Sequence, residues 1–216
     1  MGIKFTQEDF KSARQKSGVD WKEESDNLQT SISFSGSHDT NTSWTSEEMT
    51  ALLNDRPWKY WPISEVQLKI NNDGTAEMSG IFDEKKLEGY AAAIGTPQVV
   101  VDRLPILPSR AAFYLKGTGS LSNNQVSKFD ITSAKLNRIP IPTGLLLGRN
   151  QLTTQTAYAD DVTSELAKYS GKKAHVVNFI NEKLSWVKGF FASRAEFKDG
   201  KIEFEGKLPD QEITAR

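Results

Sequence analysis

The residue types in this chain that could do chemistry are two histidines, three adjacent pairs of acids and a short glycine motif. Neither His38 nor His175 has a second histidine three or four positions away, the spacing that puts two metal ligands on one helix face. The chain has no cysteine, which excludes thiolate catalysis and cysteine-ligated metals. We therefore predict no metal site and no cofactor.

Two short motifs imitate known sites. His38 precedes Asp39 and follows Ser35 and Ser37, so a nucleophile, a base and an orienting acid lie close in sequence. No Gly-x-Ser-x-Gly turn surrounds any serine, which favours a solvated loop. Residues 117–119, Gly-Thr-Gly, lack the third glycine and the following helix of a phosphate loop, and a bulge or close backbone approach explains them better.

Paired carboxylates can catalyse glycoside hydrolysis when their environments separate their pKa values. All three pairs here fall at predicted helix starts, where free amides and the helix dipole stabilise negative charge without any catalysis. They are Glu47-Glu48, Asp83-Glu84 and Asp160-Asp161. We therefore predict no catalytic residue and no enzymatic activity.

Large rings gather in two connectors, each of which follows a predicted helix. The first connector holds Trp58, Tyr60 and Trp61, and the second holds Trp186 and Phe190. Such rings could cap a groove, stack on sugars or rest at a membrane interface. They could equally plug the end of a sheet, which is the more common use of large rings. The sequence leaves both interpretations open.

Two proline-rich apolar stretches, residues 99–108 and 139–147, are unsuited to interior strands because proline lacks the amide donor of a strand ladder. If these stretches converge with the aromatic connectors, together they form an apolar cleft. The ligand-binding residues predicted on this basis are Trp58, Tyr60, Trp61, Ile139, Ile141, Leu145, Trp186 and Phe190.

The elements that must position these residues predict an α+β fold with a mainly antiparallel sheet packed against helices. Capping signals at Thr6 and Thr45 begin two helices. Alternating apolar residues on both sides of Asp73-Gly74 and of residues 122–124 predict two hairpins. Residues 36–43 are predicted to form a polar loop.

A helix followed by a hairpin occurs twice. From Asn54 to Gly74 is 20 positions and from Asn181 to Gly200 is 19, and another glycine follows six residues later in each case. We predict two related helix-plus-hairpin units at about 45–82 and 174–208. Both would lie in one α+β domain over residues 30–216, preceded by a peripheral helix and linker over residues 1–29.

The composition restricts the partners. The 216 residues are 37% hydrophobic, enough for a substantial core, and the net charge of −1 provides no basic field for nucleic acid. No apolar run approaches the roughly 18–20 residues of a membrane span, and the first residues do not resemble a signal peptide. We predict no nucleic-acid partner.

Four stretches, at residues 45–54, 72–80, 134–142 and 197–206, together resemble the YpmS-like group of membrane-anchored extracytoplasmic proteins of Gram-positive bacteria. The resemblance spans about residues 30–208 and transfers no catalytic residue. It implies an outward-facing domain behind one N-terminal membrane span. That span is missing from this sequence, and it would be the only contact with the membrane.

The leading hypothesis is a non-enzymatic extracytoplasmic domain that binds a lipid or another apolar ligand. The alternative is a protein-interaction module of a cell-envelope assembly that uses the same surface, and a carbohydrate-acting enzyme ranks third. An enclosed pocket would favour the ligand, whereas a flat exposed patch of several hundred square ångströms would favour the partner.

Overall fold

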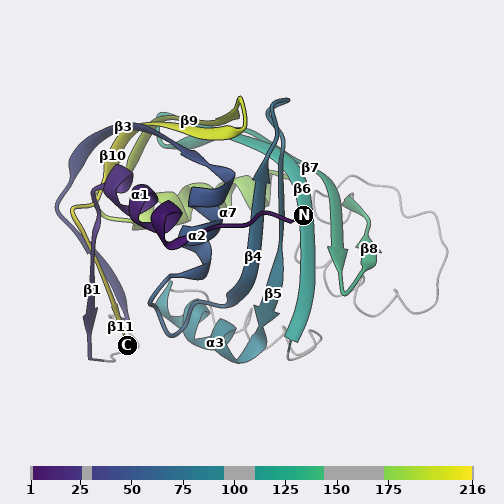
Figure 1. The fold of residues 1–216 in the computed structure, drawn as a ribbon, viewed down its shortest axis with the longest axis horizontal. Helices are drawn as coiled ribbons and strands as arrows, with labels where there is room; N and C mark the ends of the chain where they lie inside the picture. Colours follow the sequence, from purple (N-terminus) through teal and green to yellow (C-terminus); the bar gives the residue numbers. More distant parts are fainter. Residues whose placement is uncertain (1, 26–30, 95–109, 144–172, 216) are drawn as a thin grey trace.

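The structure is a computed structural model that describes residues 2–25, 31–94, 110–143 and 173–215. Four helices and eleven strands lie in these ranges, and nearly all strand pairs are antiparallel (Figure 1). The predicted α+β class and the mainly antiparallel sheet are confirmed. Within the same ranges, no helix combines the length and the apolar character that crossing a bilayer requires.

Helices alternate with strands along the chain. The elements are α1 (Gln7–Ser17), β1 (Asp20–Glu24), β2 (Ile32–Ser35), β3 (His38–Thr45), α2 (Ser46–Asn54), β4 (Ile63–Ile70), β5 (Ala76–Asp83), α3 (Glu84–Ala93), β6 (Arg110–Ser122), β7 (Gln125–Leu136), β8 (Ile139–Ile141), α7 (Lys173–Trp186), β9 (Phe191–Lys198), β10 (Lys201–Leu208) and β11 (Gln211–Ala215).

The large sheet has the order β3-β10-β9-β6-β5-β4, with β7 and β8 added beside β6. Its centre is β6, whose 13 residues pair with β5 near one end, with β9 at the other end, and with β7 along most of the strand. The sheet bends so that α2 and α7 lie within its curve (Figure 1). We call the side that faces α2 the inner face.

The N-terminal segment belongs to the fold, although the sequence predicted a peripheral helix and a linker there. Ala13 of α1 is fully buried in a core cluster with Trp44 and Phe204. After α1, β1 pairs in parallel with β11, and β2 pairs with the other side of β11. These three strands form a second, small sheet.

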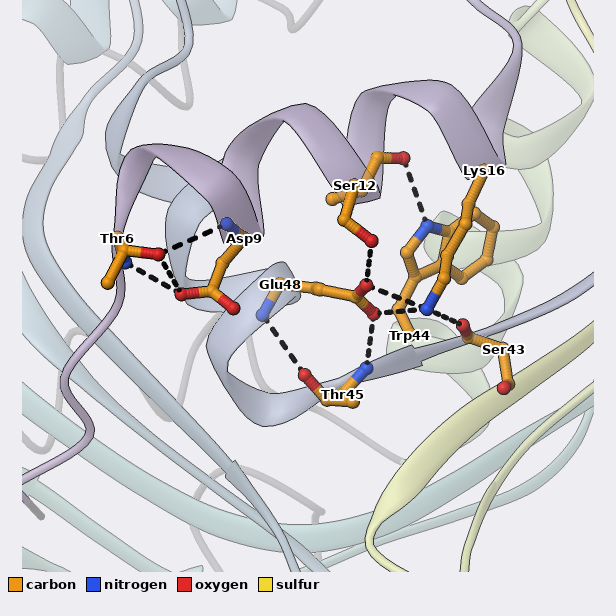
Figure 2. A network of polar contacts seen from close by, with 9 residues as sticks. Thr6, Asp9, Ser12, Lys16, Ser43, Trp44, Thr45 and Glu48 are labelled. Atoms are coloured by element: carbon orange, nitrogen blue, oxygen red, sulfur yellow. Dashed lines mark hydrogen bonds and ion pairs between the residues drawn. The ribbon is translucent and has the colours of Figure 1, made fainter.

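A polar network centred on Glu48 fastens α1 to α2 (Figure 2). The Glu48 carboxylate is 4% exposed and accepts hydrogen bonds from the Ser12 hydroxyl at 2.5 Å, the Lys16 ammonium at 2.8 Å and the Thr45 amide at 2.9 Å. Burial raises the pKa of Glu48, but these donors outweigh it and hold the pKa below its ordinary value. The acid pair at 47–48 therefore has a structural role, as its place in the capping box predicted.

The two Asp-Gly hairpin turns lie against each other. A Cβ added to Gly74 would lie 3.3 Å from the Phe197 carbonyl oxygen, and one added to Gly200 would lie 3.2 Å from the Asn72 side chain. Beneath the turns, residues of both hairpins share a core cluster with Met49 and Leu53 of α2. The two helices are placed differently, because α2 packs on β4 of the adjoining hairpin whereas α7 packs on β7.

One predicted loop is wrong. Residues 38–45 form strand β3, which pairs with β10 along its whole length. Its polar side chains hide a strand whose only buried residue is Trp44. The bulge predicted at residues 117–119 is confirmed, because the register shifts at Gly117 and a Cβ there would lie 2.2 Å from the Asp130 carbonyl oxygen.

Candidate ligand-binding site

A row of apolar side chains crosses five strands of the large sheet. Strand pairing places Leu68 opposite Met78, Met78 opposite Leu115, Leu115 opposite Ala134, and Ala134 opposite Ile141. Directly paired residues point to the same side of a sheet, so all five lie on the inner face. The row begins at Leu68, which is buried in the cluster that includes α2 residues, and continues beyond it toward β8.

A second row runs beside the first. Gly80, Phe113, Leu136 and Ile139 are paired in that order across β5, β6, β7 and β8. Gly80 leaves room for its neighbour, because a Cβ there would lie 3.0 Å from the Phe113 ring. We call the side chains of both rows on β5 to β8 the apolar strip. Its members are Met78, Phe113, Leu115, Ala134, Leu136, Ile139 and Ile141.

The apolar strip is only partly covered. Leu115 is 38% exposed and Ile139 is 67% exposed, whereas Ala134 is buried between larger neighbours. The outer face of the same strands is polar, since Tyr114 of β6 donates a hydrogen bond to Glu77 of β5 at 2.8 Å. Water-exposed apolar side chains on one face of an otherwise amphipathic sheet mark a surface that gains free energy when something covers it.

Two exposed arginines lie at one end of the strip. The β7–β8 turn is held beside β6 because the Asn137 amide donates to the Ala112 carbonyl at 2.7 Å and the Ala112 amide donates to the Asn137 side chain at 2.8 Å. This places Arg138 of the turn near Arg110 at the start of β6. The ion pair of Arg110 with Glu65 at 3.5 Å joins two largely exposed side chains, so it restrains Arg110 weakly.

The first aromatic connector is mostly interior. Trp58 is 3% exposed and packs with Ile32 and Ala93, and its ring centre lies 6.3 Å from that of Tyr60 and 5.4 Å from that of Tyr90. The indole of Trp61 packs at the same cluster and donates to the Leu53 carbonyl at 2.8 Å. These rings pack the base of the sheet, as the packing interpretation proposed.

Beside this cluster, arginines and tryptophans alternate. The Arg56 guanidinium lies 4.9 Å from the Trp61 ring centre and 5.7 Å from that of Trp21, and the Arg14 guanidinium lies 4.5 Å from the other contact of Trp21. Arg56 also donates to Glu212, which is 6% exposed. Burial raises the pKa of Glu212 above its ordinary value, although the Arg56 charge opposes this shift.

The second connector divides between two places. Trp186 is 37% exposed and meets Phe34 edge-on at 5.8 Å between ring centres, and Phe34 in turn packs on the Trp58 cluster. Phe190 instead packs on Phe204, at 5.8 Å, in the core cluster beneath α1. The structure thus joins Trp186 to the first connector but places Phe190 elsewhere.

The predicted single cleft is not what the described residues form. Ile139 and Ile141 belong to the apolar strip on β8, and neither is a member of the Trp58 cluster. Leu145, the apolar stretch at 99–108 and the Asp160-Asp161 pair lie outside the described residues.

The residues with catalytic character have structural partners. His38 contacts Asp210 through Nδ1 and the Ser17 carbonyl through Nε2, both at 2.9 Å, and the Ser37 hydroxyl donates to the Gly189 carbonyl. Asp83 caps α3 by accepting from the Lys85 amide. In the part of the chain that the structure describes, no three histidine, cysteine or acidic side chains are grouped to hold a metal ion.

The sequence analysis missed most of the apolar strip. Phe113 and Leu115 were assigned to one face of a strand, but only the register with β5, β7 and β8 shows that they continue the row from Met78 to Ile141. Arg56 and Glu212 were missed because 156 residues separate them. Alternation within residues 111–121 was the one available signal, and it cannot tell which face stays open.

Comparisons of the chain with protein-family models, with curated proteins and with solved structures find no match.

Proposed function

We propose that the protein is a non-enzymatic, extracytoplasmic binding domain for the apolar chain of an anionic amphiphile, such as a fatty acid. The observation that carries this proposal is the apolar strip, which stays open where Leu115 and Ile139 are 38% and 67% exposed. Covering an apolar side chain gains about 25 cal/mol for each Å² removed from water. An acyl chain laid along the strip supplies such cover without leaving a polar group unsatisfied.

The dimensions of the strip favour a single chain over a protein partner. Strands are about 4.8 Å apart, so the strip from β5 to β8 is about 14 Å long. Its two rows are about 7 Å apart, because each residue advances a strand by about 3.4 Å. The resulting footprint, about 100 Å², is far below the roughly 800 Å² that each partner buries in a stable protein interface.

The two arginines supply the argument for a negative head group. Arg110 and Arg138 are exposed at the end of the strip where Phe113, Leu136 and Ile139 lie. A guanidinium offers a fork of donors that matches a carboxylate or phosphate. An amphiphile with its chain on the strip and its head group at these arginines satisfies both surfaces.

Polar substitutions on the strip test the apolar part of the proposal. The double variant Leu115→Asn with Ile139→Asn is expected to bind the fluorescent fatty acid cis-parinaric acid at least about tenfold more weakly than the wild type, because each asparagine removes apolar contact worth about 1 kcal/mol. The measurement is a fluorescence titration, since this fatty acid brightens in apolar surroundings. Both replaced side chains are partly or largely exposed, so melting temperature should change little.

Phe179→Asn is the matched control, because Phe179 is 48% exposed but lies on α7 and outside the strip. It should bind the fatty acid as the wild type does. Equal binding by the double variant and the wild type would contradict the proposal and favour the interaction-module alternative.

Replacing Arg138 with glutamine tests the head group separately. We expect Arg138→Gln to weaken binding of a fatty acid by about three- to tenfold while leaving binding of the corresponding fatty alcohol unchanged, because only the acid carries a charge for the guanidinium to recognise. Competition against cis-parinaric acid measures both affinities. An equal loss for acid and alcohol would remove Arg138 from the proposal.

A further inference from the structure

The outer face of β3, β9 and β10 carries an open depression of about 440 Å³. Phe204 and Ala192 point inward into the core cluster, so their sequence neighbours Glu205 and Phe191 point outward. The volume is within the range of small-molecule sites. The side chains that matter for its chemistry are Asp39, Asn41, Phe191, Ser193, Glu205 and Lys207.

A β-bulge builds the depression. The register between β9 and β10 shifts at Glu205 and Gly206, and Gly206 has a φ of 155°. A Cβ at Gly206 would lie 2.0 Å from the Phe191 carbonyl oxygen, so only glycine permits this approach of the two strands. Bulges bend a strand and redirect its side chains, and they are frequent next to binding sites.

The depression combines one aromatic ring with several hydrogen-bonding groups. Phe191 is 42% exposed and offers a flat apolar surface. Around the ring, Asp39 and Glu205 provide carboxylate acceptors, while Asn41 provides both an acceptor and a donor. A pyranose ring has the matching properties, since one of its faces is made of C–H groups and its edge is made of hydroxyls that donate and accept.

The charge of the lining argues against anionic ligands. Two carboxylates, Asp39 and Glu205, outnumber the single ammonium of Lys207, which lies 4.0 Å from Asp39. A phosphate or carboxylate ligand would meet net repulsion there. We propose that this depression binds a neutral sugar ring, stacked on Phe191 and hydrogen-bonded by Asp39, Asn41 and Glu205. This site is separate from the apolar strip and does not depend on it.

Titration of isotope-labelled protein with cellobiose, maltose and chitobiose tests the proposal. At least one disaccharide should produce saturable amide shifts in residues 39–41, 191–193 and 205–207. Phe191→Ala should weaken that binding by about tenfold or more, because it removes the stacking surface, whereas Phe191→Tyr should retain it. Glu205→Gln should weaken it by a smaller factor, since the amide keeps one acceptor but loses the charge.

Phe179→Ala is the control, because it removes a similarly exposed ring from α7. The amide spectrum of each variant shows whether the protein remains folded. The proposal is overturned if none of the three sugars shifts the residues of the depression in a saturable way, or if folded Phe191→Ala binds as tightly as the wild type.

Discussion

Replacing Arg56 with alanine is expected to lower the free energy of unfolding at neutral pH by about 3–5 kcal/mol. The Arg56 guanidinium is the cation bound to Glu212, whose side chain is only 8% exposed. Without Arg56, the buried carboxylate must either keep an uncompensated charge or take up a proton. The variant also loses the contacts of the guanidinium with Trp21 and Trp61.

The pH dependence of this loss identifies its cause. The pKa of Glu212 is already raised by burial, and removal of Arg56 raises it further. An acid whose folded-state pKa is raised binds its proton more tightly in the folded state. Its contribution to stability is therefore full below the unfolded pKa and is lost as pH rises through the folded pKa. The variant should consequently lie closer to the wild type at acidic pH than at pH 7.

Urea unfolding at several pH values measures both effects. The double variant Arg56→Ala with Glu212→Gln should recover a large part of the lost stability at pH 7, because glutamine carries no charge to bury. If the single and double variants are equally unstable at every pH, the loss comes from packing and not from the unpaired carboxylate.

Trp58→Ala is expected to lower the free energy of unfolding by about 3–5 kcal/mol, the usual cost of truncating a buried large ring. The indole is 3% exposed and fills a cluster that joins β2 to α3. Trp58→Phe should cost less, because it keeps a ring, and the Trp58 Nε1 has no hydrogen-bond partner among the described residues. Chemical denaturation of the three proteins measures the order.

Ligand binding separates this role from a binding role. Any folded Trp58→Ala protein should bind cis-parinaric acid as the wild type does, because the apolar strip lies on other strands. A tenfold or larger loss of affinity in folded protein would show that Trp58 contacts the ligand.

Local signals account for the parts of the fold that the sequence predicted. The capping boxes at Thr6 and Thr45 depend on residues three positions apart, and both are present in the structure. The two-residue turn at Asn123-Asn124 has both residues at positive φ, as a tight hairpin requires. Such features are decided within a few residues, so the sequence shows them directly.

Features that depend on distant residues escaped prediction. Strand β3 has polar side chains and becomes a strand through pairing with β10, more than 150 residues later. The open face of the strip depends on where α2 ends its cover of the sheet, which no single segment determines. The rings of the first connector show the same limit, since Trp58 and the exposed Trp186 look alike in sequence and differ only in what surrounds them.

Strand β11 lies between β1 and β2, although it follows them by about 180 residues in the chain. On a ribosome, β1 and β2 therefore emerge long before the strand that will join them. Until residue 215 has been synthesised, both carry unpaired edges that can attract other nascent chains. The order of synthesis thus leaves the small sheet for last, and its closure marks the completion of the native fold.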